Sequence, residues 1–333
     1  MRLGGLSGGP VLRLVVCVAT WLACAAGAQT PADPGPLRGS VVRVDAEIVP
    51  DGHTAQSLGT RRSGSGVILD ARTVLTIGYL VLEAEQVSVV DADGRRTPAS
   101  VAGYDHATGF GLVRTALPLG GKALELGDSD RLAVQEKVST LGHGEADATT
   151  LLVLSRKPFS GNWEYLLERP IYTFPPINNW SGAALVDASG RLVGIGSLIV
   201  NDAADDRPGV PGNLFVPVNL LKPILAELLA QGRRSAPAQP WLGLATEQVR
   251  GNLMVVRVTR DGPAEAAGLD AGDIVIGVGA DKVAGQADFY RRVWKLGPAG
   301  VTVPLRVLKD GDVREVPVRS IDRADFLRKP RGI

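Results

Sequence analysis

The sequence predicts a mainly β chain with two domains, a larger all-β domain followed by a smaller α+β domain. Two observations indicate the first domain: its apolar runs are short and rich in β-branched residues, and Gly, Asp or Asn turns separate them. A third observation separates the second domain from the first: near residue 218 the apolar residues change to helical spacing, and a linker follows. The length of 333 residues suits two compact domains.

The composition excludes several classes of protein. With 36 basic and 35 acidic residues the net charge is +1, which favours neither a nucleic-acid-binding surface nor an acidic tail. No cluster of His, Cys, Asp or Glu has metal-ligand spacing, and Gly64-Ser65-Gly66 lacks the continuation of a phosphate-binding loop. We therefore expect no cofactor, no metal ion and no nucleic-acid partner.

Residues 1–28 have the character of a bacterial export signal. Arg2 and Arg13 precede the apolar run 14–25, and residues 26–28, Ala-Gly-Ala, offer a signal-peptidase site. The apolar run is short and interrupted for a transmembrane helix. We expect a cleaved signal and a periplasmic protein with no other membrane association. Secretion, or anchoring in the inner membrane by an uncleaved signal, is the alternative.

The two cysteines, Cys17 and Cys24, both lie within this signal segment. After cleavage the mature chain would contain no cysteine, and therefore no disulfide, no thiol nucleophile and no cysteine metal site. A small secreted domain held together by disulfides is thereby excluded.

Short strands are expected through the first domain, residues 41–231, after a flexible Pro- and Gly-rich lead at residues 29–40. Their regular spacing is typical of an all-β barrel or sandwich. The expected strands are Val41–Val49, Gly66–Leu69, Thr73–Thr76, Gln86–Val90, Ala99–Ala102, Gly111–Arg114, Lys137–Leu141, Thr149–Leu154, Ala183–Val186, Leu192–Leu198 and Leu214–Val216.

A helix and a linker separate this domain from the second one, residues 241–333. Val218–Ala230 has helical spacing and stops before Gly232, a residue suited to the C-terminus of a helix. Residues 232–240 have the composition of a linker. In the second domain we expect strands at 253–259, 274–278, 301–308 and 315–319, and helices at 263–269 and 287–296.

The motifs of the second domain resemble those of a bacterial PDZ domain. Trp241-Leu242-Gly243-Leu244 comes first, and the Gly-Pro-Ala, Ala-Gly-Leu and Ala-Gly-Asp run follows within Asp261–Gly279. The helix sequence DFYRRVW and a Gly-Pro-Ala-Gly turn complete the order. The resemblance covers almost the whole domain and implies binding of peptides or of protein C-termini.

The chemistry of the Leu-Gly-Leu turn agrees with this resemblance. Such a turn can direct successive backbone N–H groups at one carboxylate, and the strand that follows can pair with an added peptide strand. The groove is predicted between residues 244–248 and the helix 287–296, half or more of whose large apolar residues are expected to fill the core. Arg233 and Arg234 could assist a carboxylate, but we interpret them as solvated linker charges. The predicted peptide-binding residues are Trp241, Leu242, Gly243, Leu244, Phe289 and Val293.

The first domain resembles the HtrA (DegP-like) serine proteases over roughly residues 41–232. Gly64-Ser65-Gly66-Val67-Ile68 matches the Gly-Ser-Gly-Val-Ile signature of that family, and Leu126–Leu132 matches its Gly-Asp-Ser segment. The resemblance implies a chymotrypsin/trypsin-like double β-barrel, followed by the α+β PDZ domain.

The motifs that hold the catalytic triad of this family are altered here. Tyr79 stands at the position of the base histidine, and Gly109 at the position of the aspartate that orients it. The nucleophile Ser181 is kept, but its motif reads Asn-Trp-Ser-Gly-Ala where the family has Gly-Asn-Ser-Gly-Gly. Asn179 and Ser181 would supply the N–H groups of the oxyanion hole, with Asn179 in the place of a glycine.

A tyrosine cannot do the work of the missing histidine. Its ordinary pKa is about 10, and Gly109 offers no acidic partner. Loss of the base costs on the order of a million-fold in kcat in serine proteases. His53 and His143 lie in turns, which leaves His106 as the histidine expected near the cleft; Lys157 has no supporting spacing.

These features predict an exported HtrA-type pseudoprotease that binds peptides or unfolded polypeptide through its PDZ domain, as a chaperone, adaptor or regulator in protein quality control. An active serine endopeptidase that uses Ser181 with a non-standard base is the alternative, and a purely structural scaffold is a third. The resemblance also implies a homotrimer assembled through the protease domain.

Overall fold

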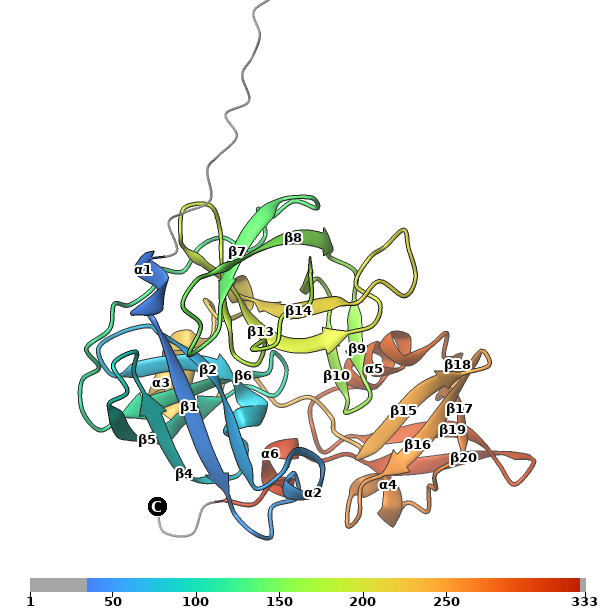
Figure 1. Ribbon diagram of the computed structural model, residues 1–333. Helices are drawn as coiled ribbons and strands as arrows, with labels where there is room; N and C mark the ends of the chain where they lie inside the picture. Colours follow the sequence, from blue (N-terminus) through green and yellow to red (C-terminus); the bar gives the residue numbers. More distant parts are fainter. Residues whose placement is uncertain (1–34, 330–333) are drawn as a thin grey trace, which may run out of the picture. The chain divides into compact units, whose positions relative to one another are not determined.

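Two closed six-stranded β-barrels follow each other along the chain in the computed structural model (Figure 1). The structure describes residues 35–329. The predicted export signal, with Cys17 and Cys24, and the first part of the flexible lead lie outside the described residues. Among the helices of the described part, none has both the length and the apolar character that a bilayer crossing requires.

The first barrel closes because its strand β1 pairs with β2 on one side and with β4 on the other. This closure leaves no exposed sheet edge. Val44, Val67, Leu75 and Leu112 are fully buried in its hydrophobic cluster. In ladder order the strands are β1 (Val41–Ile48), β2 (Arg61–Ile68), β3 (Thr73–Ile77), β6 (Phe110–Thr115), β5 (Arg96–Tyr104) and β4 (Ala84–Val90).

The second barrel is built in the same way and is closed by the pairing of β11 with β8. Val153, Ile171, Leu185 and Phe215 are fully buried within it. In ladder order its strands are β11 (Ile171–Phe174), β14 (Gly212–Pro217), β13 (Leu192–Val200), β12 (Ala184–Val186), β7 (Lys137–Leu141) and β8 (Thr149–Ser155). Both barrels confirm the double β-barrel that the sequence predicts.

Every strand expected in the first domain is present, with ends that differ by a few residues. Three strands were not expected: β9 (Phe159–Gly161), β10 (Tyr165–Leu167) and β11. The first two form a two-stranded hairpin of three residues each, which is too short to show an alternating apolar pattern. This hairpin proves to be important for the second domain.

The single helix expected at Val218–Ala230 is wrong. The segment begins with a 3-10 turn, η2 (Val218–Leu220), and continues as the short helix α3 (Leu225–Gln231). Pro223 explains the interruption, because proline lacks the N–H that a helix interior needs and disfavours helical backbone in the residue before it. Gly232 ends α3 in left-handed backbone with φ 74°, as expected from the sequence.

The second domain is a five-stranded antiparallel path, β15-β16-β17-β19-β20, with β18 paired to β17. Helix α5 buries Phe289, Tyr290 and Val293 in the core of this domain. Helix α5 and the rest of this domain belong with the barrels to one compact unit of the described chain. Its elements are β15 (Leu244–Val249), β16 (Asn252–Val258), α4 (Pro263–Ala266), β17 (Ile274–Val278), β18 (Asp281–Lys282), α5 (Gln286–Lys295), β19 (Thr302–Lys309), β20 (Asp312–Arg319) and α6 (Arg323–Phe326).

Candidate functional site

Ser181 lies in a tight turn that leads into strand β12. Its carbonyl accepts the N–H of Ser65 at 2.7 Å, and the next residue, Gly182, donates to the carbonyl of Gly196 at 2.8 Å. Gly182 has φ +74°, and a Cβ atom there would lie 1.9 Å from the Ser65 carbonyl oxygen. Only glycine therefore fits this position of the serine turn.

Tyr79 reaches Ser181 from the 3-10 turn η1 (Gly78–Leu80), which follows strand β3. Its Oη atom lies 2.7 Å from Ser181 Oγ and 3.0 Å from the carbonyl oxygen of Ser197. Because that carbonyl can only accept, the single tyrosine proton belongs there, and the Ser181 hydroxyl can then donate to Tyr79 Oη. The tyrosine occupies the place of a general base beside the serine.

The electrostatics of Tyr79 oppose any role as a base. Burial raises its pKa well above the ordinary value, and the hydrogen bond with Ser181 offsets only part of this rise. A neutral phenol oxygen attracts a proton far too weakly to ionise a serine hydroxyl. The contact between Tyr79 and Ser181 therefore holds the serine in place without activating it.

Gly109 supplies backbone contacts but no carboxylate. It has φ +79°, its N–H donates to the Asp105 carbonyl at 2.8 Å, and its own carbonyl accepts the N–H of Gly78 at 2.7 Å. A Cβ atom on it would lie 3.1 Å from Tyr165 Oη, which donates to the Thr108 carbonyl. A side chain at this position would therefore crowd the Tyr165 hydroxyl.

The interpretation of Arg234 as a solvated linker charge is wrong. Its guanidinium donates two hydrogen bonds to the Asp105 carboxylate, at 2.7 and 2.6 Å. Asp105 is only 4% exposed and also accepts from Thr108, whereas the Arg234 side chain is 30% exposed. The bidentate geometry suits a guanidinium and fixes the start of the linker to the first barrel. Arg233, by contrast, is exposed.

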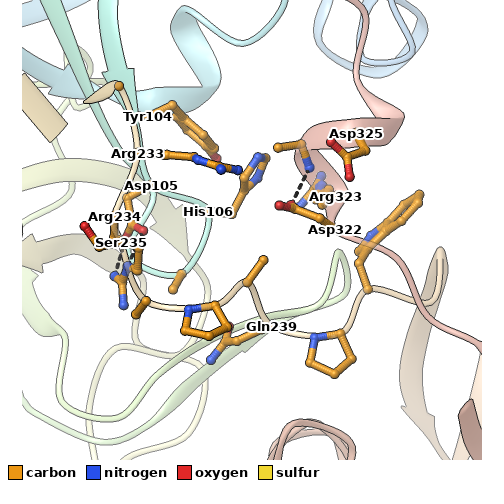
Figure 2. A pocket seen from close by; sticks show the side chains of 18 of the residues that line it. Tyr104, Asp105, His106, Arg233, Arg234, Ser235, Gln239, Asp322, Arg323 and Asp325 are labelled. Atoms are coloured by element: carbon orange, nitrogen blue, oxygen red, sulfur yellow. Dashed lines mark hydrogen bonds and ion pairs between the residues drawn. The ribbon is translucent and has the colours of Figure 1, made fainter. Parts of the chain in front are cut away.

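The expectation that His106 lies near the serine cleft is also wrong. Its ring packs edge-on against Tyr104, with 4.4 Å between centroids, and lines a separate pocket of about 850 Å³ with the linker and α6. Figure 2 shows this pocket, with Arg323 and Asp322 of the α6 region labelled beside His106. Burial, with a smaller effect from Arg323, lowers the pKa of His106 to about 3.

The histidine that shares the cleft with Ser181 is His143. The cleft, about 410 Å³, is lined by both residues together with Tyr79, Asn179 and Trp180. The sequence gives no signal for this proximity, because the loop that carries His143 follows β7, far along the chain from Tyr79. Burial, and to a lesser extent Arg43, lowers the pKa of His143.

The hydrogen bonds of His143 leave it poorly placed as a base. Its backbone N–H donates to Ser65 Oγ at 2.9 Å, and its ring Nδ1 lies 3.1 Å from the same oxygen. When Ser65 Oγ donates its own proton to Nδ1, the ring proton resides on Nε2. In this tautomer no ring lone pair remains for the Ser181 proton.

Asn179 is exposed, and its side-chain amide donates to Glu145 Oε1 at 3.2 Å. Trp180 is half-buried beside Tyr79, with 6.4 Å between the ring centroids. The oxyanion role of the Asn179 and Ser181 N–H groups stays a prediction.

The Leu-Gly-Leu turn of the second domain does hold a carboxylate, and it is one from the chain itself. The N–H groups of Leu242, Gly243 and Leu244 donate to the Glu164 carboxylate at 2.8, 2.7 and 3.0 Å. Gly243 has φ +79°, the left-handed backbone that brings successive N–H groups to one side. Glu164 lies in the turn of the β9–β10 hairpin and carries no sequence signal of its own.

The remaining predicted peptide-binding residues are buried. Phe289 and Val293 lie in the hydrophobic core of the domain at 0% and 1% exposure, and Trp241 is 7% exposed against Phe326. Their role in binding a peptide stays a prediction.

Burial raises the pKa of Glu164 to about 7, although the three N–H donors act in the opposite direction.

Comparison with known proteins agrees with this architecture. A model of the trypsin-like peptidase domain matches residues 64–195, and a model of the PDZ domain matches residues 240–319. The serine protease PepD of Mycobacterium tuberculosis is 31% identical over 90% of this chain and 67% of its own length. The periplasmic serine endoprotease DegP of Salmonella typhimurium is 28% identical over 74% of this chain.

The chain is shorter than several of its relatives. It spans 58% of a probable periplasmic serine protease of Haemophilus influenzae, described as do/HhoA-like, and 54% of the Salmonella DegP. Among solved structures, the HtrA-type protease AlgW with a tripeptide shares the fold with a TM-score of 0.51 and 22% identity, covering 89% of this chain and 96% of its own. This chain belongs to the HtrA family of trypsin-like proteases with a C-terminal PDZ domain, as its two barrels, its PDZ domain and its relatives show.

Proposed function

We propose that this chain is an HtrA-type pseudoprotease that binds peptides or unfolded polypeptide and does not cleave them. The observation that carries the proposal is the contact of Tyr79 Oη with Ser181 Oγ at 2.7 Å. A buried phenol stands where a base is needed, and no side chain stands at Gly109 to orient or charge it. Without a base, serine proteases lose about a million-fold in kcat.

The peptide-binding part of the proposal rests on the Leu242–Leu244 turn. Its three N–H groups already bind a carboxylate in the structure, which is the chemistry that a peptide C-terminus offers. AlgW, which shares the fold, has been solved with a tripeptide and with a decapeptide. A chaperone, adaptor or regulator of an active relative would use this same site.

The location and assembly of the protein belong to the proposal as well. Several of the matched relatives are described as periplasmic, and residues 1–28 have the composition of an export signal. We therefore place the mature chain in the periplasm, with domains at 41–231 and 241–333. A homotrimer assembled through the protease domain is proposed from the family resemblance.

Turnover of an unfolded substrate tests the proposal. We expect the wild-type chain and a Ser181→Ala variant to leave β-casein intact to the same extent over a day. In parallel, a decapeptide with a free C-terminal carboxylate should bind more tightly than its C-terminal amide, as measured by calorimetry. Cleavage that disappears in Ser181→Ala would refute the pseudoprotease proposal, and equal binding of acid and amide would refute the binding proposal.

An active endopeptidase with an unusual base is the second candidate, and one observation favours it: His143 shares the cleft with Ser181. This candidate requires the His143 ring to leave Ser65 and turn its lone pair to Ser181. It predicts β-casein cleavage that both Ser181→Ala and His143→Ala abolish. Cleavage that persists in His143→Ala would exclude this base.

A further inference from the structure

The carboxylate site of the PDZ domain is fully occupied by a residue of the barrel domain. Glu164 Oε1 accepts the N–H groups of Gly243 and Leu244, and Oε2 accepts that of Leu242. All three donors of the turn are therefore used. A peptide C-terminus that arrives at this turn finds no free N–H group until Glu164 leaves.

The backbone around Glu164 is shaped for this contact. Glu164 has φ +60°, a conformation that is uncommon for residues other than glycine and costs on the order of 1 kcal/mol. Its own N–H donates to Tyr290 Oη at 3.3 Å, and Tyr290 in turn donates to the Gly161 carbonyl at 2.8 Å. The hairpin turn is thus held from both sides by a tyrosine of the PDZ helix α5.

The two arms of the hairpin add contacts along the predicted groove. Helix α5 packs against β9, β10 and β15, which are the hairpin and the first strand of the PDZ sheet. Leu166 packs against the hydrophobic core of the PDZ domain. At the two ends, Arg291 binds the Glu168 carboxylate at 2.8 and 2.6 Å, and Asn162 donates to Glu247 at 3.2 Å.

The hairpin does not replace a peptide along the whole groove. Strand β15 forms its only ladder in the described part of the chain with β16, and the β9–β10 hairpin is a separate two-stranded sheet. The competition between hairpin and peptide is therefore located at the carboxylate turn and along α5. The edge of β15 is left for the backbone of an incoming peptide.

We propose that the β9–β10 hairpin, residues Phe159–Leu167, is an internal ligand of the PDZ domain, and that Glu164 stands in for a peptide C-terminal carboxylate. A peptide binds only when the hairpin is displaced. This inference rests on the proposed peptide-binding function and adds its regulation. Because the internal ligand is tethered, its local concentration at the turn is high. The apparent affinity for a peptide equals the affinity of the open state multiplied by the fraction of molecules in that state.

Peptide binding to hairpin variants of the full chain tests this inference. The probe is a pool of fluorescein-labelled decapeptides with random internal residues and a free Val, Leu or Phe C-terminus, and the amidated pool is its control. The variants are Glu164→Ala and the isosteric Glu164→Gln. The matched control is Glu315→Ala, which removes an exposed glutamate from β20 of the same domain. Thermal unfolding checks that each variant folds.

We expect the dissociation constant for the free-acid pool to fall at least tenfold in Glu164→Ala and by a smaller factor in Glu164→Gln. Glu315→Ala should bind as the wild type does, and the amidated pool should bind weakly to every variant. Hydrogen exchange provides the second readout, because the amides of Leu242, Gly243 and Leu244 should exchange faster in Glu164→Ala and become protected again by peptide.

Two failures are distinguishable. If wild type and Glu164→Ala bind the free-acid pool equally, the hairpin is no competitor and the inference is overturned, while the proposed peptide binding stands. If neither binds the pool, the proposed binding function fails and displacement by peptide fails with it. The exchange rates of the three amides then decide whether the hairpin occupies the turn, and unchanged rates in Glu164→Ala would contradict that occupancy.

Discussion

At the scale of single residues, Tyr79 and Gly109 both take part in hydrogen bonds close to Ser181 or to the turn that carries Tyr79. The Tyr79 hydroxyl hydrogen-bonds with Ser181 and with the Ser197 carbonyl. The Gly109 N–H donates to the Asp105 carbonyl, and the Gly109 carbonyl accepts the N–H of Gly78. These hydrogen bonds engage polar groups that would have to change partners during catalysis. Under the proposed pseudoprotease function, these contacts also bear on any substitution that introduces a histidine or an aspartate here.

Restoring the two missing side chains should not restore activity. In Tyr79→His with Gly109→Asp, the aspartate must take φ +79° and place its Cβ 3.1 Å from Tyr165 Oη, so it is strained and crowded there. We expect β-casein cleavage by the double variant to equal that of the triple variant that also carries Ser181→Ala. Cleavage clearly above that background would show that the site had kept a catalytic geometry.

The serine turn should depend strongly on Gly182. Gly182→Ala places a Cβ atom 1.9 Å from the Ser65 carbonyl oxygen in addition to the left-handed φ of +74°. We expect a loss of about 3 kcal/mol or more in the free energy of unfolding, measured with urea.

Gly144→Ala is the matched control for this change. Gly144 has φ +77° but open space around its Cβ position. Its substitution should cost only the backbone term, about 1 kcal/mol. Equal losses in the two variants would contradict the steric argument.

At the scale of elements, apolar runs and turn residues identify every barrel strand except β11. The helix predicted at Val218–Ala230 is too long because the helical spacing of apolar residues continues across Pro223, whereas the helical backbone is interrupted there. The sequence does not predict the β9–β10 hairpin because strands of three residues are too short to show an alternating apolar pattern. The hairpin whose turn contacts the PDZ domain is therefore among the elements that the sequence does not predict.

The linker is fixed to the first barrel by the ion pair of Arg234 with Asp105. Arg234→Ala leaves a carboxylate that is 4% exposed without its bidentate partner. We expect a loss of about 1–3 kcal/mol in the free energy of unfolding. Arg233→Ala removes the neighbouring, exposed guanidinium and should change stability by less than about 0.5 kcal/mol. The reverse order in urea unfolding would show that the linker is held elsewhere.

At the scale of the whole molecule, the candidate sites depend on contacts between residues far apart in the sequence. Family motifs place Tyr79 with Ser181 because the fold is shared, and the structure brings them within 2.7 Å. No motif marks Glu164, Arg234 or His143 as partners of the residues that they contact. These contacts arise from how this chain packs its own loops, so only the structure reveals them.

Stability should fall in acid through His106. Its pKa is lowered to about 3 from an ordinary value of 6.5, with burial as the main cause. The unfolded chain therefore binds a proton below pH 6.5 that the folded chain refuses until about pH 3. The stability contributed by the neutral ring is complete above pH 6.5 and is lost as the pH falls through this window.

The difference between wild type and His106→Gln in urea unfolding from pH 7 to pH 4 checks this sign, because Glu164, whose pKa is raised to about 7, contributes with the opposite sign in both chains. One proton gives a slope of at most about 1.4 kcal/mol per pH unit. His106→Gln should lose most of that slope, because glutamine does not titrate. A profile of the variant that is as steep as that of the wild type would place the acid sensitivity in other groups.

The central claim is that Ser181 is not an activated nucleophile, and covalent labelling tests it most directly. A fluorophosphonate reacts with activated serines, and intact-mass spectrometry counts the label on the folded chain. We predict that wild type and Ser181→Ala remain equally unlabelled under conditions that label an active trypsin-like protease to completion. A mass increase of one phosphonate on the wild type that is absent from Ser181→Ala would contradict the account.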